Sequence, residues 1–221
     1  MQSTVSSNWS LLPRELSTEL LSHTTPCHLK AGQTLFEIGD EGNGCYLLDR
    51  GALKVTLTSG HAGERIVSIL RPGAVVGDLS MIDGLPRSAS VTALTACELR
   101  FISRKHFQQI VEAHPEIYRD LANVLAGRLR DCDNQVAAQT FLPMKSRVAR
   151  ALLELAESFG SMETPETIVL SRHFTQSDLA ALAGVARETA NRIMNEWERM
   201  GILSKTSQNY KIDNARLRRE I

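Results

Sequence analysis

The pattern of apolar and polar positions changes its period near Pro115. Before that point, short segments rich in β-branched and apolar residues alternate with glycine-containing turns, at 34–38, 45–49, 52–58, 65–70, 90–93 and 97–102. Strands at this spacing, with no helix-length segment between them, predict a compact antiparallel β structure rather than parallel βαβ units. Ten of the fourteen glycines lie between Gly32 and Gly84, where tight turns need positive φ angles.

A long helix is predicted after Pro115. Apolar residues recur there in steps of three or four, at Ile117, Leu121, Leu125, Leu129, Cys132 and Val136. The helix should end before Pro143, because proline disfavours helical geometry in the residue that precedes it. Such a stripe either covers the chain's own β structure or pairs with the same stripe of a second chain, as in a coiled coil. The segments that follow favour the second alternative.

The rest of the chain is predicted to be mainly helical. A helix over 146–159 would bury Val148, Leu152, Leu153 and Leu155, and a polar loop should follow over 160–167. Thr175 and Asp178 are spaced to cap a further helix with Leu179, Ala180 and Leu182 on its core face. Gly184 ends it, and after the turn over 184–186 another helix begins at Arg187. Two short helices joined by such a turn are typical of a helix-turn-helix.

The second of these helices has a polar face suited to DNA. Its buried stripe is predicted to be Ala190, Ile193, Met194 and Trp197, which leaves Arg187, Glu188, Asn191, Arg192 and Asn195 on the outer side or its flanks. Arginine can bond guanine bidentately, and glutamate can accept from the cytosine amino group. The alternative is an ordinary helical hairpin with a solvated charged face. The segment after this helix favours a DNA-binding role, because the sequence of residues 202–213 predicts a two-stranded wing. Lys205 and Lys211 of that wing are placed to reach phosphates.

Residues 77–91, GDLSMIDGLPRSASV, form a second informative segment. Gly77 permits close approach of the backbone, and the Asp78 carboxylate can bond a sugar hydroxyl. Ten residues after Gly77, the guanidinium of Arg87 stands beside the hydroxyl of Ser88 and exposed backbone N–H groups, a combination that can hold a phosphate. Apolar residues at 79, 81 and 82 predict a short helical piece held against the β structure. The alternative is a surface loop that turns near residue 83.

Charge and cysteine content narrow the classes of protein. The whole chain has no net charge, but residues 1–142 carry 13 basic and 15 acidic residues and residues 143–221 carry 12 and 10, which leaves room for a basic face near the end. Four widely spaced cysteines without C-x-x-C spacing predict reduced thiols. No apolar run approaches the roughly 20 residues that span a bilayer, and the polar first ten residues lack export features. We therefore expect a cytoplasmic protein with no membrane partner.

Taken in order, these features resemble the cyclic-AMP receptor protein (CRP/FNR) family from about residue 23 to residue 213. The match comprises a β-roll, the Gly-acidic-Leu…Pro-Arg-Ser-Ala segment, a long helix, and a winged helix with Arg-Glu-Thr-x-x-Arg. The resemblance implies an α+β fold: an N-terminal antiparallel β-roll, which is a cyclic-nucleotide-binding jelly roll, a long dimerisation helix and a C-terminal winged helix-turn-helix. The implied domains are 1–114, which would include an N-terminal helix, 115–142 with a hinge, and 143–221.

The resemblance assigns roles to individual residues. The cyclic-nucleotide-binding residues would be Gly77, Asp78, Leu79, Ser80, Arg87, Ser88 and Ala89, with Arg87 and Ser88 on the cyclic phosphate and Asp78 on the ribose 2′-hydroxyl. Arg128 would support the acidic residue. Arg187, Glu188 and Arg192 would read TGTGA-like half-sites of palindromic double-stranded DNA, with further contacts from Gln176, Ser177, Thr189, Asn191 and Lys205. A homodimer, contact with RNA polymerase and an allosteric cyclic nucleotide are implied, and neither a catalytic residue nor a metal is expected.

Two departures from the family pattern concern the ligand. The acidic residue is usually glutamate, and Asp78 is one methylene shorter, which predicts a longer or water-mediated ribose contact. The positions that usually carry a Thr-Ser pair against adenine are Cys132 and Asp133. A thiol is a weak hydrogen-bond partner, whereas a carboxylate can accept from the adenine amino group or from N1–H and N2–H₂ of guanine. Cyclic AMP, cyclic GMP and both together therefore stay open.

Other interpretations fit the residues less well. An iron–sulfur sensor of the same family needs clustered N-terminal cysteines, where Cys27 stands alone. A haem sensor has candidate ligands in His23, His28 and His61, but the Arg87-Ser88 pair points to an anionic ligand. A cupin-like metal enzyme needs more histidines within the roll, and a kinase-type regulatory module needs a catalytic segment in the place that the winged helix takes. The sequence therefore predicts a regulator of transcription and not an enzyme.

Overall fold

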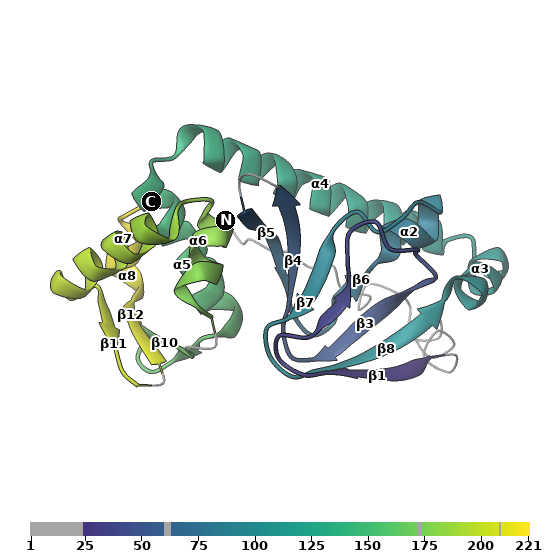
Figure 1. Cartoon of the computed structure of the whole chain (residues 1–221), viewed down its shortest axis with the longest axis horizontal. Coiled ribbons are helices and arrows are strands. Elements are labelled where there is room, and N and C mark those ends of the chain that lie inside the picture. The colour runs from purple at the N-terminus through teal and green to yellow at the C-terminus, as the bar shows by residue number, and fades with distance from the viewer. Residues whose placement is uncertain (1–23, 60–62, 172–173, 208) are drawn as a thin grey trace. The chain divides into compact units, whose positions relative to one another are not determined.

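The computed structural model describes residues 24–59, 63–171, 174–207 and 209–221. Its contacts divide the chain into two compact units, one made of Met1–Leu57 and Val67–Asn134 and the other of Thr58–Ile66 and Gln135–Ile221. Figure 1 labels helices and strands of each unit. The expected N-terminal helix, the polar N-terminal residues, His23 and His61 lie outside the described residues.

Two four-stranded sheets make up the β-roll. The first has the order β1 (Thr25–Leu29), β8 (Cys97–Ser103), β3 (Gly44–Arg50) and β6 (Val75–Val76). The second has the order β2 (Thr34–Phe36), β7 (Ser90–Ala93), β4 (Leu53–Ser59) and β5 (Gly63–Leu70). The pairings β1–β8, β3–β8, β3–β6, β2–β7 and β4–β7 are antiparallel, which confirms the predicted roll. All six predicted strands are present; β1 and the two-residue β6 were not predicted.

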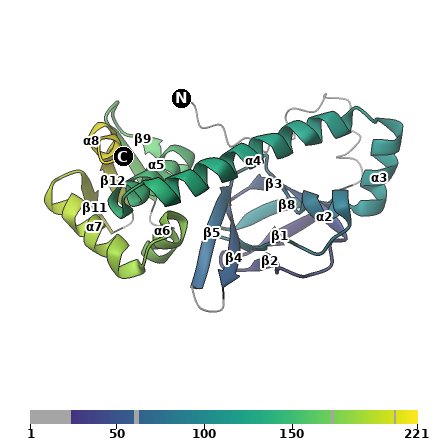
Figure 2. The same ribbon diagram turned by 90° about the horizontal axis from the view of Figure 1, so that it is seen from above.

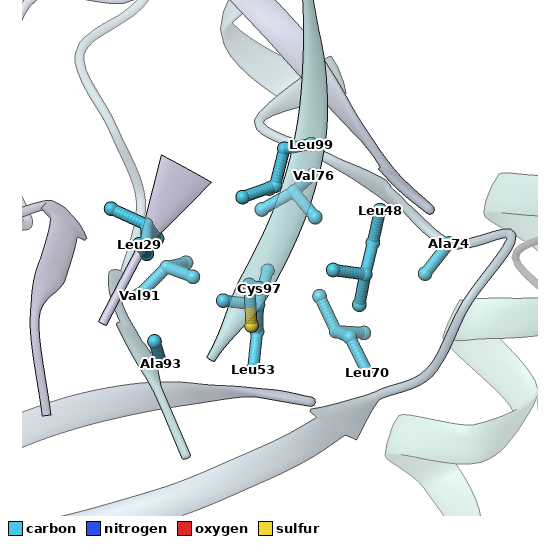
Figure 3. Close-up of a cluster of buried hydrophobic side chains, with 10 residues drawn as sticks. All are labelled: Leu29, Leu48, Leu53, Leu70, Ala74, Val76, Val91, Ala93, Cys97 and Leu99. Atoms are coloured by element: carbon cyan, nitrogen blue, oxygen red, sulfur yellow. The ribbon is translucent and has the colours of Figure 1, made fainter. Parts of the chain in front are cut away.

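The core of the roll takes side chains from both sheets (Figure 3). The cluster comprises Leu29, Leu48, Leu53, Leu70, Ala74, Val76, Val91, Ala93, Cys97 and Leu99. Along β7, buried and half-buried residues alternate, which is the period-two pattern of a strand with one face in the core. Leu48 and Leu53 are fully buried, and each contributes roughly 1.5–3 kcal/mol through removal of its side chain from water.

A second cluster joins the roll to three helices. These are α2 (Asp78–Asp83), α3 (Arg104–Ala113) and the first turns of α4 (Ile117–Phe141). Met81 of α2, Phe107 of α3 and Ile117 of α4 are buried together with Cys45 of the first sheet. The helical piece predicted near residues 79–82 is therefore confirmed as α2. Helix α3 was not predicted, although Phe107, Ile110 and Val111 recur at helical spacing.

Helix α4 is one continuous helix, as the apolar periodicity predicted (Figure 2). Its stripe is buried at the start, at Ile117 and Leu121, and exposed further along, where Leu129 is 63% and Val136 64% exposed. The roll therefore covers part of the predicted stripe, and Leu129 and Val136 leave apolar surface on the chain. No helix of the described residues is both long and apolar enough to cross a bilayer.

The second unit contains the predicted pair of helices and the wing. Helix α5 (Met144–Phe159) precedes β9 (Ser161–Met162) and β10 (Thr167–Ser171), and α6 (Gln176–Ala183) and α7 (Arg187–Arg199) follow. The wing strands β11 (Leu203–Lys205) and β12 (Asn209–Asp213) lead to α8 (Asn214–Arg218). The sheet order is β11-β12-β10-β9, with all pairs antiparallel. The winged helix-turn-helix is therefore confirmed.

Two predictions for this unit were wrong. The segment 160–167 is not simply a polar loop, since it contains β9 and the first residue of β10. The reason is long-range pairing: β12 pairs with β10 from Thr167↔Asp213 onwards, and β10 in turn pairs with β9. Leu182 was expected in the core of α6 but is half-buried, and the buried residue of that turn is Ala183.

Candidate functional site

A cavity of about 160 Å³ lies on the β-roll, lined by residues of both sheets, α2 and α4. All seven residues expected to hold a ligand within 77–89 line it, together with Arg128. The remaining lining residues are Phe36, Val55, Ser68, Leu70, Val75, Val76 and Val91. Residues that lie far apart in the sequence therefore meet in one concave site.

Arg87 supplies a buried positive charge to this cavity. The residue is 4% exposed, and its guanidinium donates from Nη1 to the Gly77 carbonyl and from Nη2 to the Gly44 carbonyl, each at 2.8 Å. Its Nε is buried and has no hydrogen-bond partner within the described part of the chain. Burial lowers the pKa of Arg87, because the charged form loses hydration. The site thus holds a fixed cation with an unused donor.

Gly77 is required at its position for two reasons. Its φ of +80° lies in the left-handed region, which other residues rarely adopt. A Cβ there would also lie 2.3 Å from Nη1 of Arg87. The missing side chain therefore lets the backbone of residue 77 approach the guanidinium and accept its hydrogen bond.

Asp78 is buried at the start of α2 and forms an ion pair with Arg128 of α4. Nη1 of Arg128 lies 2.8 Å from Oδ1 of Asp78, and Nη2 donates to the carbonyl of Val75 at 3.0 Å. A carboxylate so deeply buried needs such a partner, because an unpaired buried charge is strongly unfavourable. The ion pair links the cavity to the long helix.

The other expected ligand residues differ in exposure. Ser80 is buried, Ala89 is half-buried, and Leu79 and Ser88 are exposed at the cavity. Cys132 and Asp133, one turn beyond Arg128 on α4, are exposed and are not among the residues that line the cavity in the described chain. The structure therefore brings together the residues expected around the phosphate and ribose and leaves the pair expected around the base outside.

The chemistry of this cavity suits a small anion with hydroxyl groups. Arg87 and Ser88 provide donors, and Asp78 provides an acceptor. Among the described residues, histidine, cysteine and acidic side chains do not gather in any group that could hold a metal ion. His28, one of the candidate haem ligands, is exposed on β1 and does not line the cavity. The positive guanidinium of Arg87 at the cavity fits a phosphate and does not fit a cation.

Three contributors to the site were not predicted. They are Phe36, whose ring lies against the Arg87 guanidinium, and the carbonyl groups of Gly44 and Val75. No local pattern marks these residues, because each reaches the site through the pairing of strands that are distant in the sequence.

All four cysteines are free, as predicted, and they differ in environment. Cys45 is fully buried under the cavity; burial raises the pKa of its thiol, and the nearby charge of Asp78 adds to the effect. Burial likewise raises the pKa of Cys97. Cys132 is exposed on α4. The reactive thiolate form is therefore disfavoured at Cys45 and Cys97.

We expect iodoacetamide to alkylate Cys132 faster than Cys45 in the folded protein, because Cys132 is exposed on α4 of the single chain. Cys45 should react at least ~100-fold more slowly, because its thiol must wait for the core to open. Peptide mass spectrometry, after labelling with and without guanidinium chloride, measures both rates. The variant Cys132→Ser serves as control, since it should lose the rapid alkylation and keep the slow alkylation of Cys45. Rapid labelling of Cys45 in the native protein would contradict the buried position.

The paired helices of the second unit carry the expected caps and faces. The Thr175 hydroxyl accepts from the Asp178 N–H at 3.1 Å, and the Asp178 carboxylate accepts from the Thr175 N–H at 3.0 Å. Gly184 ends α6 with a φ of +63°. The four residues predicted for the buried stripe of α7 are all buried. Arg187, Glu188, Arg192, Asn195 and Ser177 are exposed, while Thr189, Asn191 and Gln176 are half-buried.

The back of α7 is fixed by Glu220. The indole Nε1 of the fully buried Trp197 donates to a carboxylate oxygen of Glu220 at 3.2 Å, and Lys145 of α5 lies 2.7 Å from the same oxygen. The carbonyl of Glu220 also accepts from the Ser146 hydroxyl at 2.8 Å. These contacts hold α7 against α5 and thereby fix the orientation of the exposed polar face of α7.

Both wing lysines have acidic partners. Nζ of Lys205 lies 2.9 Å from Glu198 and 3.1 Å from the Asn195 side chain, and Nζ of Lys211 lies 2.7 Å from Glu163. Contact of these lysines with phosphate stays a prediction, and each lysine would have to exchange its carboxylate partner for the phosphate. Pairing of this kind depends on long-range packing and leaves no sequence signal.

Comparison with known proteins gives the same order of parts. Residues 26–114 match the cyclic nucleotide-binding domain family, and residues 146–220 match the Crp-like helix-turn-helix domain family. The chain is 30% identical over 201 residues to the CRP-like cAMP-activated global transcriptional regulator of Mycobacterium tuberculosis, covering 90% of this chain and 89% of the relative. It is 31% identical over 188 residues to the cAMP-activated global transcriptional regulator CRP of Salmonella typhimurium, with coverage of 83% and 87%.

Solved structures show the same fold. The c-di-GMP responsive global regulator CLP of Xanthomonas campestris superposes with a TM-score of 0.78 at 23% identity, over 90% of this chain and 99% of that one. FixK2 of Bradyrhizobium japonicum superposes with a TM-score of 0.76 at 18% identity, over 89% of this chain and 96% of that one. At these identities the likeness concerns the fold alone.

A cyclic nucleotide-binding roll and a helix-turn-helix on one chain define a class, the DNA-binding transcription regulators with a cyclic nucleotide-binding domain. The chain belongs to the CRP/FNR family of transcription regulators, because both family domains match in order and relatives of at least 30% identity align over most of its length. The family consists of regulators, so the protein is not an enzyme.

Proposed function

We propose that this protein is a homodimer that binds cyclic AMP, cyclic GMP or both in each β-roll and thereby gains affinity for a palindromic DNA site. The observation that carries the proposal is Arg87, a buried guanidinium that lines the cavity beside Ser88 and is hydrogen-bonded to neutral carbonyls alone. A phosphate is the anion that such a guanidinium binds well. The relatives named as cAMP-activated support the cyclic phosphate as its source.

The ligand residues take the following roles. Arg87 and Ser88 would hold the cyclic phosphate, Asp78 would hold the ribose 2′-hydroxyl, and Gly77, Leu79, Ser80 and Ala89 would shape the wall around them. Because Arg128 already holds Asp78, a change at the cavity reaches α4 directly. A ligand can shift a conformational equilibrium only through contacts that differ between the two states, and this ion pair is such a contact.

The homodimer would form along α4. The exposed Leu129 and Val136 support this assignment, since apolar residues at this spacing pack well against a second copy of the same helix. Residues 1–114 would then form the sensing domain, 115–142 the dimerisation helix with a hinge near residues 140–143, and 143–221 the DNA-binding domain. Ligand binding would turn the two DNA-binding domains until their recognition helices lie ~34 Å apart, the spacing of successive major grooves.

DNA reading is assigned to the exposed face of α7. Arg187, Glu188 and Arg192 would contact bases of TGTGA-like half-sites, and Gln176, Ser177, Thr189, Asn191 and Lys205 would contact the backbone or neighbouring positions. By analogy with the family, bound dimers would contact RNA polymerase. Since promoter DNA and polymerase of bacteria lie in the cytoplasm, the protein would act there.

Base selectivity is assigned to Cys132 and Asp133. A single carboxylate can accept two hydrogen bonds from guanine and one from adenine, so Asp133 should favour cyclic GMP more than the usual serine does. We expect Asp133→Ala to weaken cyclic GMP binding about tenfold or more, since hydrogen bonds to charged groups contribute ~1.5–3 kcal/mol, and to weaken cyclic AMP binding less. Calorimetric titration with each nucleotide measures the ratio.

Asp131→Ala is the matched control, because it removes the same charge two residues away on the same helix and should leave the ratio of affinities unchanged. An Asp133→Ala variant with the wild-type ratio of cyclic GMP to cyclic AMP affinity would end the assignment of base selectivity to Asp133.

The test of the whole proposal is DNA binding by fluorescence anisotropy at fixed salt. A TGTGA-N6-TCACA duplex and a scrambled duplex are titrated without nucleotide, with cyclic AMP and with cyclic GMP. We expect binding to the palindrome that rises with nucleotide and exceeds binding to the scrambled duplex by ~10³-fold or more. Specific binding that ignores both nucleotides would overturn the ligand part of the proposal and leave a DNA-binding regulator with another signal.

A further inference from the structure

Phe36 contacts the guanidinium of Arg87 from outside the segment 77–89. The centre of its ring lies 4.3 Å from Cζ of Arg87, within the ~6 Å over which a cation is attracted to an aromatic face. Gly77 meets the same guanidinium, since a Cβ there would lie 2.3 Å from Nη1 of Arg87 and 3.4 Å from Cε1 of Phe36. Ring, guanidinium and glycine backbone therefore pack together at one point of the cavity wall.

The hydrogen-bond partners of the Arg87 guanidinium within the described chain are neutral. Its two hydrogen bonds go to the backbone carbonyls of Gly77 and Gly44, and its third neighbour is the ring of Phe36. Asp78, the carboxylate of the same cavity, is paired with Arg128 at 2.8 Å. No carboxylate is hydrogen-bonded to the Arg87 guanidinium within the described chain, although the charges of Asp40 and Asp78 act on it from further away.

This kind of support leaves the cation available to a ligand. A carboxylate beside Arg87 would compete with an incoming anion for the same N–H donors. The Phe36 ring, with Cζ of Arg87 over its face, instead has no oxygen that could accept from an N–H donor. The Nε of Arg87 has no hydrogen-bond partner within the described residues. Phe36 therefore stabilises the buried charge and occupies none of the donors that an anion needs.

The ring of Phe36 is itself held in place. Its centroid lies 6.3 Å from that of Tyr46, which in turn lies 5.0 Å from that of Phe101. The pairing of β2 with β7 shifts register between Thr34 and Phe36, so Phe36 sits at an irregularity of the sheet edge beside the cavity. Such irregularities serve to re-aim a side chain.

We infer that Phe36 is a positioning residue for the anionic group of the ligand: it holds the guanidinium of Arg87 in place and supports its charge without taking up a hydrogen-bond donor. The inference rests on the proposed function in one respect, namely that the anion is the phosphate of a cyclic nucleotide. It assigns to β2 a part in ligand affinity that lies outside the segment from Gly77 to Ala89.

The test compares Phe36→Leu and Phe36→Met, which keep an apolar side chain, with Phe36→Tyr, which keeps the ring. Cyclic AMP affinity is measured by calorimetry on the full chain, and the Nε–H resonance of Arg87 is followed by NMR without nucleotide. We expect the leucine and methionine variants to bind ~3- to 30-fold more weakly. Their Arg87 proton should also lose the ring-current shift of the wild type, and Phe36→Tyr should restore both properties.

Phe159→Leu is the matched control, since it removes a ring that packs on Phe174 at 4.9 Å in the other unit and should leave both readouts unchanged. Equal affinity in the leucine, methionine and tyrosine variants would overturn the inference, because apolar volume alone would then suffice. If the wild type binds no cyclic nucleotide, the proposed function fails, and the NMR shift still decides whether the ring holds Arg87.

Discussion

Replacing Arg87 with glutamine is expected to weaken cyclic AMP binding by at least ~30-fold, because loss of one partner from a buried, hydrogen-bonded charge pair costs roughly 2–5 kcal/mol. The physical reason lies in the cavity. Arg87 is 4% exposed and lines the cavity, where the other arginine, Arg128, is paired with Asp78, so a phosphate in the variant would be buried without its counterion. Calorimetric titration of the purified variant with cyclic AMP gives the loss directly.

The matched control for this prediction is Arg100→Gln. Arg100 lies on β8 of the same roll and pairs bidentately with Asp49, at 2.6 and 2.5 Å, away from the residues that line the cavity. The Arg100→Gln variant loses one positive charge, as Arg87→Gln does. Its affinity for cyclic AMP should stay within about twofold of the wild-type value, because the Arg100–Asp49 pair is partly exposed and lies away from the ligand. Circular dichroism checks that both variants fold. An Arg87→Gln protein that is folded and binds cyclic AMP normally would remove the phosphate assignment.

The second large effect is expected at the DNA face. Arg187→Ala should weaken binding to the palindromic duplex by ~30-fold or more, because a bidentate contact to guanine contributes roughly 1–3 kcal/mol and a homodimer loses it in both half-sites. Arg187 is exposed in the first turn of α7, where it can reach a base edge. Anisotropy with the palindromic and the scrambled duplex, at one salt concentration, separates base reading from phosphate contact.

Arg218→Ala controls for the loss of one positive charge in the same unit, since Arg218 of α8 is paired with Glu157. It should affect both duplexes equally and weakly. If Arg187→Ala weakens the palindrome and the scrambled duplex by the same factor, Arg187 contacts phosphate and does not read the sequence.

The parts of the fold that could be predicted are those with local signals. The capping pair Thr175 and Asp178, the left-handed Gly184 and the buried stripe of α7 depend on residues within one or two turns of each other. The same holds for α4, whose apolar stripe recurs in steps of three or four residues from Ile117 to Val136. Strand β6 has two residues and shows no alternation, and β9 gains its hydrogen bonds from β10, so neither leaves a readable pattern.

The same distinction between local signals and long-range contacts applies to the candidate site. Gly77 and Arg87 could be predicted together because they stand ten residues apart in one segment that resembles a known family. The contact of Phe36 with Arg87 depends on how β2 pairs with β7. The pairing of Lys211 with Glu163 depends on how β12 and β9 flank β10. Such contacts between distant residues are fixed by packing, and composition or periodicity does not encode them.

The central claim is that the nucleotide cavity and the DNA-reading face are energetically coupled, and reciprocity tests it most directly. Cyclic AMP affinity is measured by calorimetry for the full chain alone and for the chain saturated with the palindromic duplex. We predict that DNA tightens cyclic AMP binding by the same factor by which cyclic AMP tightens DNA binding, at least about tenfold. Equal cyclic AMP affinity with and without the duplex would contradict the claim, since two sites without coupling cannot form a ligand-dependent regulator.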